Sequence, residues 1–380
     1  MSGQTEVGDV MIYLDNAATT WKKPPTVYRA LTQAVRKYGN PGRSSHALSL
    51  SASEMIDDVR CLAAELIGAE DPSHIVFTMN ATMALNLAIK TRIQRCGHIL
   101  ISDREHNAVY RPVCRLAREK IADFDVFSTR GNLQTNILSL LRENTQMLIC
   151  NHVSNVDGSI APIREIGELC RTRGIYFILD LSQSLGHIPF SLGEVCADAV
   201  CAPGHKGLFG VPGVGFVWLR DGHILREFLE GGSGSSSLSP SMPSDLPEKM
   251  EAGTLPTPAI AALGAGIRFL KKQTVEAVAA HEELLAARLC DRLYGIRGLH
   301  IYRGGRGGPI SLCPTGITPD ALTARLDAEG ICVRGGLHCA PLAHAALGTQ
   351  STGTVRVSFS FFNTREEIDH FALRLHSLLP

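Results

Sequence analysis

A lysine in a glycine-rich loop and a carboxylate at the end of an apolar run are the residues of this chain best suited to chemistry. Lys206 lies within Gly204–Gly210, and Asp180 follows the apolar residues 175–179. A lysine amine forms a Schiff base with an aldehyde, and a carboxylate can keep a pyridine nitrogen protonated so that the ring accepts electrons. The pair therefore indicates pyridoxal 5'-phosphate (PLP) chemistry. A Gly-His-Lys triplet alone is a weak signal, because most such lysines lie in surface loops.

A phosphate group would need backbone amides, and one segment is suited to provide them. Asn80, Ala81 and Thr82 join the end of a predicted strand to the start of a predicted helix. The free amides of Ala81 and Thr82 at such a helix start favour an anion. Simple helix capping by Asn80 or Thr82 is the alternative. Beside a Schiff-base lysine, phosphate binding is the preferred interpretation.

Other polar side chains follow further predicted strands. His106 follows the strand predicted at residues 98–102, and it could stack on an aromatic cofactor, relay protons or cap a helix. Asn155 and Gln183 also follow strand ends, where each could bind a ring oxygen. Each signal is weak alone. Together they predict one site at one edge of a sheet.

The elements that would position these residues alternate between strand and helix. Strands are predicted at residues 74–79, 98–102, 124–127, 147–153 and 175–180, and helices at residues 81–93, 110–120, 133–142 and 165–172. This alternation predicts a mainly parallel sheet covered on both faces, with active groups at the carboxyl ends of the strands. Two more strands, at residues 198–202 and 214–219, predict a hairpin or crossover pair around the lysine loop.

After residue 230 the pattern changes. Residues 231–239 are rich in Gly and Ser, which fits either a flexible linker or an ordered loop beside the substrate. A long helical stretch is predicted from Pro258 to Leu293. Strands of a smaller α+β unit are predicted at residues 300–302, 310–312, 331–333 and 355–359. A capping box from Thr364 to Glu367 predicts the start of the last helix, and the first helix is predicted at residues 26–37.

Composition excludes several classes of protein. The chain has 380 residues, of which 44% are hydrophobic and 19% charged, as in a globular protein with a large core. Lys plus Arg equals Asp plus Glu, at 37 each, so no global charge favours nucleic acid or a membrane surface. No apolar run approaches the roughly 18 residues of a membrane span, and the N-terminus lacks a secretory pattern. Eleven cysteines without a Cys-x-x-Cys motif predict reduced thiols in the cytoplasm and no metal site.

Short segments that match the motifs of one known enzyme family occur in the same order along nearly the whole chain. They cover residues 13–20, 40–43, 80–82, 105–107, 151–155, 180–183, 204–206, 251–255, 336–340, 355–358 and 363–364. The set resembles the cysteine desulfurase family, PLP enzymes of the class V aminotransferase group. The resemblance implies the α/β fold of type I PLP-dependent transferases, with a mainly parallel seven-stranded sheet sandwiched by helices in a large domain of residues 15–255. A smaller α+β domain would comprise residues 1–14 and 256–380.

The resemblance also implies how the cofactor would be held. Lys206 would form the Schiff base and move the Cα proton, Asp180 would pair with the pyridine nitrogen, and His106 would stack on the ring. Asn155 and Gln183 would hold the substrate side and the ring hydroxyl.

The phosphate would be bound by Ala81, Thr82 and His205 under the same resemblance. Thr254 would reach the phosphate from the second subunit of a homodimer. This chain has Pro203 where relatives often carry Ser or Thr, so Ser182 or water is expected to replace one phosphate hydroxyl.

The substrate side follows in the same way. Arg356 would clamp the substrate carboxylate and Ala17 would contact the substrate, which is L-cysteine or L-selenocysteine. Cys339 would receive the sulfur of L-cysteine as a persulfide, leave L-alanine and pass the sulfur to an acceptor protein. A thiolate is required for this attack, and the adjacent His338 is expected to help form it. Leu337 stands where many members have a second histidine.

Alternatives remain at this stage. A selenocysteine lyase, another C–S lyase or an aminotransferase of the same group would use the same lysine, aspartate and arginine. In an aminotransferase Cys339 would have no role. A binding scaffold that keeps the catalytic residues without their activity is a further alternative.

Overall fold

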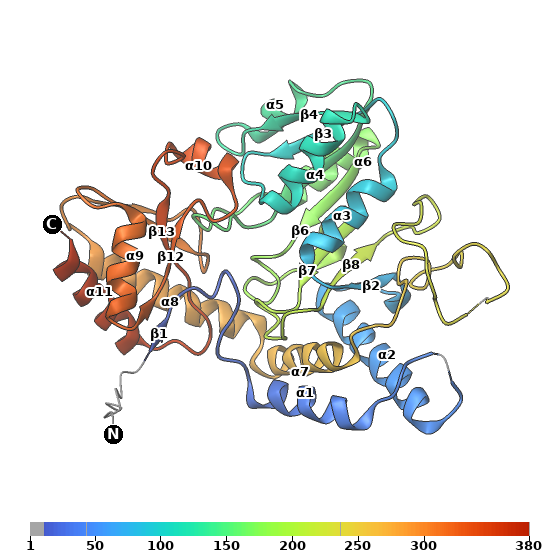
Figure 1. Cartoon of the computed structure of the whole chain (residues 1–380). Helices are drawn as coiled ribbons and strands as arrows, with labels where there is room; N and C mark the ends of the chain where they lie inside the picture. The colour runs from blue at the N-terminus through green and yellow to red at the C-terminus, as the bar shows by residue number, and fades with distance from the viewer. Residues whose placement is uncertain (1–10, 43, 236, 380) are drawn as a thin grey trace.

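The computed structural model describes residues 11–42, 44–235 and 237–379. A seven-stranded sheet with helices on both faces forms the larger part, and a four-stranded antiparallel sheet with its own helices forms the smaller part (Figure 1). The predicted α/β fold is confirmed. No helix within the described residues is both long enough and apolar enough to cross a lipid bilayer.

The large sheet has the strand order β2-β8-β7-β6-β5-β3-β4. Its strands are β2 (Ile75–Thr78), β3 (Gly97–Ser102), β4 (Ala122–Phe127), β5 (Thr145–Asn151), β6 (Tyr176–Asp180), β7 (Ala199–Pro203) and β8 (Gly215–Leu219). Five neighbouring strands, β4, β3, β5, β6 and β7, are parallel to one another. Strand β8 runs antiparallel to both β7 and β2. The two strands that flank the lysine loop, β7 and β8, therefore pair as neighbours.

Alternating side chains of these strands face two hydrophobic layers. On one face lie α3 (Ala81–Arg92) and α4 (Asn107–Arg118). The other face is covered by α2 (Ala47–Ile67), α5 (Leu133–Leu138), α6 (Ile163–Arg173) and α7 (Thr257–Gln273). The first helix, α1 (Pro25–Lys37), packs on α7 through Val27 and Ala262. Short 3-10 turns occur at Pro72–His74 and Leu192–Glu194.

The small sheet has the order β12-β13-β10-β9, and a separate two-stranded pair joins β1 to β11. Its strands are β9 (Leu299–Tyr302), β10 (Ile310–Pro314), β12 (Arg334–Gly336) and β13 (Thr354–Val357), with β1 (Ile12–Tyr13) parallel to β11 (Ile331–Cys332). The helices are α8 (Val275–Leu293), α9 (Pro319–Ala328), α10 (Pro341–Leu347) and α11 (Arg365–Leu378). The predicted capping box at Thr364 and Glu367 starts α11, as expected.

Several local predictions differ from the structure, mostly by a few residues at the ends of elements. The helix predicted from Pro258 to Leu293 is broken at Thr274, which has φ 69° and accepts the Ala277 amide to begin α8. The helix predicted to reach residue 142 ends at Leu138. The strand predicted at residues 331–333 ends at Cys332.

The predicted domain boundaries at residues 14/15 and 255/256 stay a prediction. Side chains of α7 such as Ile260 lie in the core of the large sheet, although α7 falls within the range assigned to the small domain. Residues 1–10 of that range lie outside the described residues.

Candidate functional site

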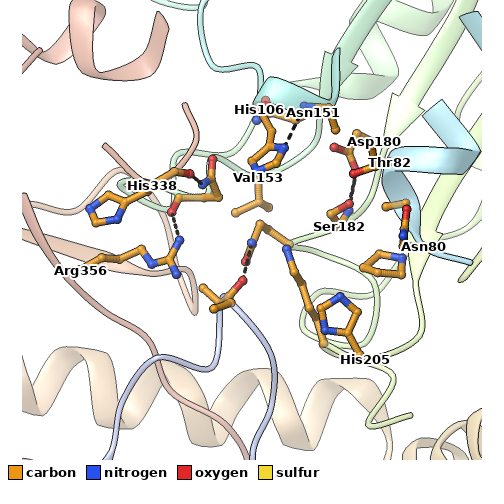
Figure 2. Close-up of a pocket in the computed structure, with 18 of the residues that line it drawn as sticks. Asn80, Thr82, His106, Asn151, Val153, Asp180, Ser182, His205, His338 and Arg356 are labelled. Carbon is orange, nitrogen blue, oxygen red and sulfur yellow. Dashed lines mark hydrogen bonds between the residues drawn. The ribbon is translucent and has the colours of Figure 1, made fainter. Parts of the chain in front are cut away.

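A cavity of about 200 Å³ lies where the carboxyl ends of the parallel strands approach the small sheet (Figure 2). Most of the predicted site residues line it, namely Ala17, Ala81, Thr82, His106, Asn155, Asp180, Gln183, His205, Lys206 and Arg356. Cys339 and Thr254 do not. Figure 2 shows His106, Asp180, His205 and Arg356 arranged around this common space. The strand-end rule therefore predicted correctly where these polar residues gather.

Close backbone packing holds the loop that carries Lys206. The Thr20 hydroxyl lies 3.1 Å from the Lys206 carbonyl and 3.0 Å from the His205 carbonyl. A Cβ on Gly207 would lie 2.2 Å from the Leu185 carbonyl oxygen, so only glycine fits there.

The amine of Lys206 is half-buried at the cavity. Burial, together with the guanidinium groups of Arg356 and Arg334, lowers the pKa of Lys206 to about 8, against the opposing effect of Asp180. At pH 7 roughly a tenth of this amine is therefore unprotonated, far more than for an ordinary lysine, and the unprotonated form is the one that adds to a carbonyl.

Asp180 ends β6 with its carboxylate at the cavity. Its Oδ1 accepts the Ser182 backbone N–H at 2.8 Å and the Ser182 hydroxyl, while Oδ2 has no hydrogen-bond donor among the described residues. Burial raises the pKa of Asp180, and the bonds from Ser182 and the charge of Lys206 oppose that rise. A protonated ring nitrogen would supply the charged partner that this buried carboxylate lacks.

The start of α3 offers an anion site. Asn80 Oδ1 caps the helix by accepting the Met83 amide at 2.9 Å, which leaves the Ala81 and Thr82 amides without an acceptor among the described residues. Capping by Asn80 and anion binding are thus compatible. His205 lines the same cavity, and its Nδ1 is buried without a hydrogen-bond partner in the described part of the chain. These groups fit a phosphate.

The structure changes the expectation for Pro203 and Ser182. Both residues line the cavity. The Ser182 hydroxyl donates to Asp180, so its single proton is already used and does not replace the hydroxyl missing at Pro203.

His106 holds a neutral imidazole at the cavity. Its Nδ1 accepts the Ala108 amide at 3.0 Å, so the neutral ring carries its proton on Nε2. Burial, together with the charge of Lys206, lowers the pKa of His106 to about 4. A neutral ring is suited to stacking, whereas a relay through an imidazolium is not expected at neutral pH.

Arg356 is buried on β13, and its donors are only partly used. Nη1 donates to the Asn155 carbonyl at 3.1 Å and Nη2 to Asp15 Oδ1 at 2.7 Å, while Nε has no acceptor among the residues that the structure describes. Asn155 donates Nδ2 to the His338 carbonyl at 2.7 Å, and its Oδ1 is buried without a donor. Arg356 Nε and Asn155 Oδ1 can therefore bind a molecule in the cavity.

The N-terminal segment closes another side of the cavity. Ala17 donates its amide to Ser358 Oγ at 2.8 Å, and its carbonyl accepts Gln183 Nε2 at 3.0 Å. One amide proton of Gln183 is thus donated to the Ala17 carbonyl. The second amide proton and the side-chain oxygen of Gln183 could hold a ring hydroxyl.

Cys339 is exposed at the edge of the site, outside the residues that line the cavity. The expected help from His338 is not supported. The His338 ring is buried, its Nε2 bonds Thr354 Oγ1 at 3.0 Å, and burial lowers the pKa of His338 to about 2, so this ring is neutral. Arg334 Nη2 instead lies 3.5 Å from Cys339 Sγ.

Sequence reasoning did not identify two residues of this region. Arg334 lines the cavity from β12, directly opposite Arg356 in the register of β12 and β13. Glu105 is fully buried behind the cavity, bonded to the Ser102 hydroxyl and the Asn151 amide, and burial raises the pKa of Glu105 to about 8. Glu105 lies in the matched segment 105–107, and Arg334 lies two residues before the matched segment 336–340. This position was the one sequence signal that pointed to them.

Comparisons with known proteins agree with this geometry. The aminotransferase class-V family matches residues 12–371. A probable cysteine desulfurase of Aeropyrum pernix is 32% identical over 97% of this chain and 94% of the relative. One of Methanothermobacter thermautotrophicus is 32% identical over 94% of this chain and 92% of the relative.

Solved structures give the same result. The apo cysteine desulfurase of Thermococcus onnurineus NA1 superposes with a TM-score of 0.88 at 29% identity, covering 97% of this chain and 94% of the other. The S-sulfonic acid form of the Escherichia coli cysteine desulfurase CsdA superposes with a TM-score of 0.89 at 25% identity, covering 99% and 97%.

Proposed function

The chain belongs to the aminotransferase class-V family and, within it, to the PLP-dependent cysteine desulfurases, and we propose that Cys339 takes the sulfur of L-cysteine and leaves L-alanine. One observation carries the proposal. A single cavity is lined by Lys206, Asp180 and Arg356, and the segment that bears Cys339 forms its edge.

The residues present fit PLP. When bound, PLP supplies an electron sink for charge that develops at the substrate Cα. The amides of Ala81 and Thr82, together with His205, would hold its phosphate, and Asp180 would hold the ring nitrogen protonated. His106 would cover the ring face as a neutral imidazole. Lys206, whose pKa lies near 8, would remove the Cα proton and later return it.

Binding of the amino acid would use Arg356, Asn155 and Ala17. Among the described residues, Arg356 Nε from the small sheet and Asn155 Oδ1 from the loop after β5 have no hydrogen-bond partner. A guanidinium is suited to a carboxylate because its donors match the two oxygens. Gln183 would hold the ring hydroxyl with its remaining capacity.

Sulfur transfer would then need only the thiolate of Cys339. Its Sγ attacks the substrate sulfur, an S–S bond forms, the Cβ–S bond breaks, and the electron pair stays with the substrate carbon. That carbon takes up a proton and gives alanine. Arg334 places a positive charge beside the sulfur that attacks as an anion.

We extend the proposal to the partners. The protein would act as a homodimer, because Thr254 is exposed and does not line the cavity of its own chain. A sulfur-acceptor protein would collect the persulfide from the exposed Cys339. All eleven cysteines are free, which supports a place in the cytoplasm.

The test compares two substrates. The purified holoenzyme is given L-cysteine or L-selenocysteine, and alanine is measured with wild type and Cys339→Ser. The proposal expects alanine from L-cysteine with wild type and little with Cys339→Ser. Full activity of Cys339→Ser on both substrates would instead indicate a lyase that does not use this thiol.

A further inference from the structure

The backbone that carries Cys339 is held in an unusual conformation. His338 has φ 49° and Cys339 φ 58°, in the left-handed region that side chains other than glycine disfavour. Such a conformation persists only where the surroundings fix it. The His338 carbonyl accepts Asn155 Nδ2 at 2.7 Å, and the Cys339 carbonyl accepts the Asn107 amide at 2.7 Å.

These two hydrogen bonds come from two different loops of the large sheet. Asn107 is the first residue of α4, directly after the loop of residues 103–106 that follows β3, and Asn155 lies in the loop of residues 152–162 that follows β5. The second loop also packs Val156 against Ala340, the residue after Cys339. The position of Cys339 therefore depends on how these two loops lie relative to each other.

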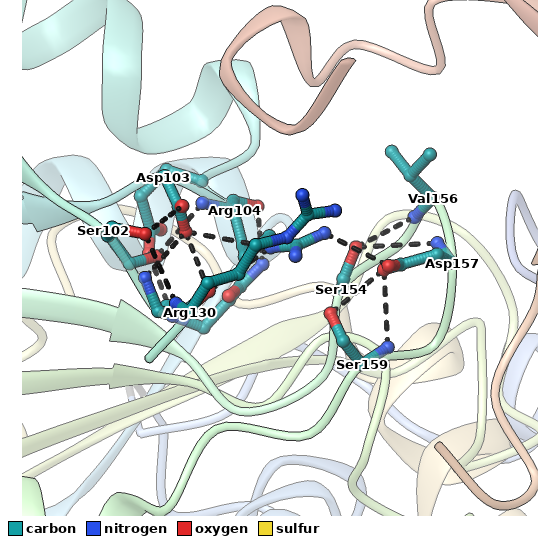
Figure 3. Close-up of polar contacts among 12 residues, drawn as sticks. Ser102, Asp103, Arg104, Arg130, Ser154, Val156, Asp157 and Ser159 are labelled. Atoms are coloured by element: carbon teal, nitrogen blue, oxygen red, sulfur yellow. Dashed lines mark hydrogen bonds and ion pairs between the residues drawn. The ribbon is translucent and has the colours of Figure 1, made fainter. Parts of the chain in front are cut away.

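A buried ion pair joins the two loops (Figure 3). Arg104 Nη1 lies 3.0 Å from Asp157 Oδ2, and both side chains are almost wholly buried. Arg104 lies three residues before Asn107, and Asp157 lies two residues after Asn155. The first loop is also tied to the end of β5, because the Arg104 carbonyl accepts Asn151 Nδ2 at 2.7 Å.

Both members of the pair are fixed by further contacts. Asp157 Oδ1 accepts the Ser159 amide at 3.2 Å and its hydroxyl at 2.8 Å. Arg104 Nε donates to Thr129 Oγ1 at 3.2 Å and lies 3.5 Å from Asp103. Burial alone would raise the pKa of Asp157, but the charge of Arg104 and bonds from serine hydroxyls and the Ser159 amide outweigh burial and lower it. The carboxylate is therefore charged at neutral pH.

The loop that carries Asp157 is also pressed against the small sheet. The Asp157 carbonyl accepts the Gly304 amide at 2.7 Å, and the Val156 carbonyl accepts the Ser311 hydroxyl at 2.7 Å. A Cβ on Gly158 would lie 2.9 Å from Gly308 Cα, so the backbones are in direct contact. The ion pair thus lies where both loops and the small sheet converge.

We propose that Arg104 and Asp157 are positioning residues that fix the His338–Cys339 backbone at the edge of the cavity. Neither residue lines the cavity. They act through Asn107 and Asn155, which hold the two carbonyls of that backbone. The inference rests on the proposed function, because it concerns the residue that would receive sulfur.

The test removes the charges of both residues at once. Loss of one partner alone would leave a buried charge unpaired and would destabilise the whole protein. The double variant Arg104→Met/Asp157→Asn removes both charges of the pair, and Asp103, which lies 3.5 Å from Arg104 Nε, keeps its hydrogen bonds from the Thr129 amide and hydroxyl. Arg104→Gln/Asp157→Asn keeps a neutral hydrogen bond and serves as the rescue variant. Arg288→Met/Asp369→Asn is the matched control. This ion pair joins α8 to α11, with 2.8 Å between Arg288 Nε and Asp369 Oδ1, and it lies away from the cavity.

Two measurements follow on the holoenzymes. Amide hydrogen exchange of the peptide covering residues 335–342 is expected to be roughly tenfold faster in Arg104→Met/Asp157→Asn than in wild type or the control. Single-turnover formation of alanine from L-cysteine is expected to fall by roughly 10²-fold. The visible absorbance of the bound cofactor, and its change when L-cysteine is added, are expected to stay. The rescue variant should lie between these extremes.

The outcomes separate the inference from the proposed function. Wild-type exchange and wild-type turnover in the double variant would overturn the inference. So would a loss of cofactor absorbance together with turnover, because that result indicates a general structural role. A wild-type enzyme that forms no alanine from L-cysteine would overturn the proposed function, while the exchange rates would still decide whether the pair fixes the segment.

Discussion

Asp15 neutralises the guanidinium that we propose for the substrate carboxylate. Arg356 Nη2 lies 2.7 Å from Asp15 Oδ1, and the exposed fractions of the two side chains are 1% and 20%. Within the described residues, this guanidinium also donates to the Asn155 carbonyl, and its Nε has no acceptor. A substrate carboxylate at Arg356 would therefore compete with Asp15 for the same charge.

The variant Asp15→Asn removes this competition and keeps a hydrogen-bond acceptor. Loss of one partner of a fully buried ion pair costs about 3–5 kcal/mol. Because Asp15 is partly exposed, water screens it, and we expect a loss of about 2 kcal/mol in the free energy of unfolding without substrate. The released charge should bind the substrate carboxylate better, so KM for L-cysteine should fall by roughly tenfold, equivalent to about 1.4 kcal/mol.

Denaturant unfolding with and without L-cysteine, together with steady-state KM, measures both effects. Asp369→Asn is the control, since Asp369 pairs with Arg288 and Arg292 away from the cavity and should leave KM unchanged. An increase of KM in Asp15→Asn would refute the reasoning. It would mean that Asp15 orients Arg356 for the substrate rather than competing with it.

Three further predictions concern the cavity and its support. The rate at which PLP binds to the apoprotein, measured by visible absorbance, should increase as pH rises through about 8, because only the free amine of Lys206 adds to the aldehyde. A rate that does not depend on pH would contradict this prediction. Burial raises the pKa of Glu105 from 4.5 to about 8, so its proton is kept by the folded state and released by the unfolded state between these values. Unfolding free energy should therefore fall as pH rises across that range, by up to about 1.4 kcal/mol per unit, and Glu105→Gln should flatten the slope in urea titrations. Gly207→Ala should lower both thermal stability and PLP absorbance, because its Cβ would meet the Leu185 carbonyl at 2.2 Å; unchanged values would show that the Lys206 loop shifts freely.

Strand-end geometry explains why so much of the site could be predicted from sequence. In a parallel sheet the carboxyl ends of the strands share one edge, so residues as far apart as His106, Asn155 and Asp180 gather once the strands are recognised. The order of matched motifs then assigned their roles. The starts of helices could be predicted equally well, because capping residues such as Asn80 and Thr364 bond to residues only three positions further along the chain.

Contacts set by long-range register could not be predicted in this way. Arg334 reaches the cavity because β12 pairs with β13, and β12 is a three-residue strand that contains two glycines. The proximity of Arg334 to Cys339 depends on the left-handed backbone of His338 and Cys339. No local sequence pattern predicts this backbone conformation. The same backbone leaves the His338 ring buried against Thr354, which is why the role expected for His338 is not supported.

The break in the long helix has a different cause. Apolar periodicity continues from α7 into α8, so the pattern alone predicts one helix. The break is made at Thr274, a β-branched residue at φ 69° without a neighbouring glycine or proline. Helical periodicity cannot detect a backbone conformation of this kind.

The mass of the Cys339 peptide after incubation with L-cysteine tests the central claim most directly. The holoenzyme is given L-cysteine, alkylated and digested, and the alanine formed is measured in the same sample. We predict that this peptide gains the mass of one sulfur atom, in an amount that follows the first turnover of alanine, and that Lys206→Ala shows neither product. Alanine formed without sulfur on Cys339, or with sulfur on another cysteine, would contradict the account.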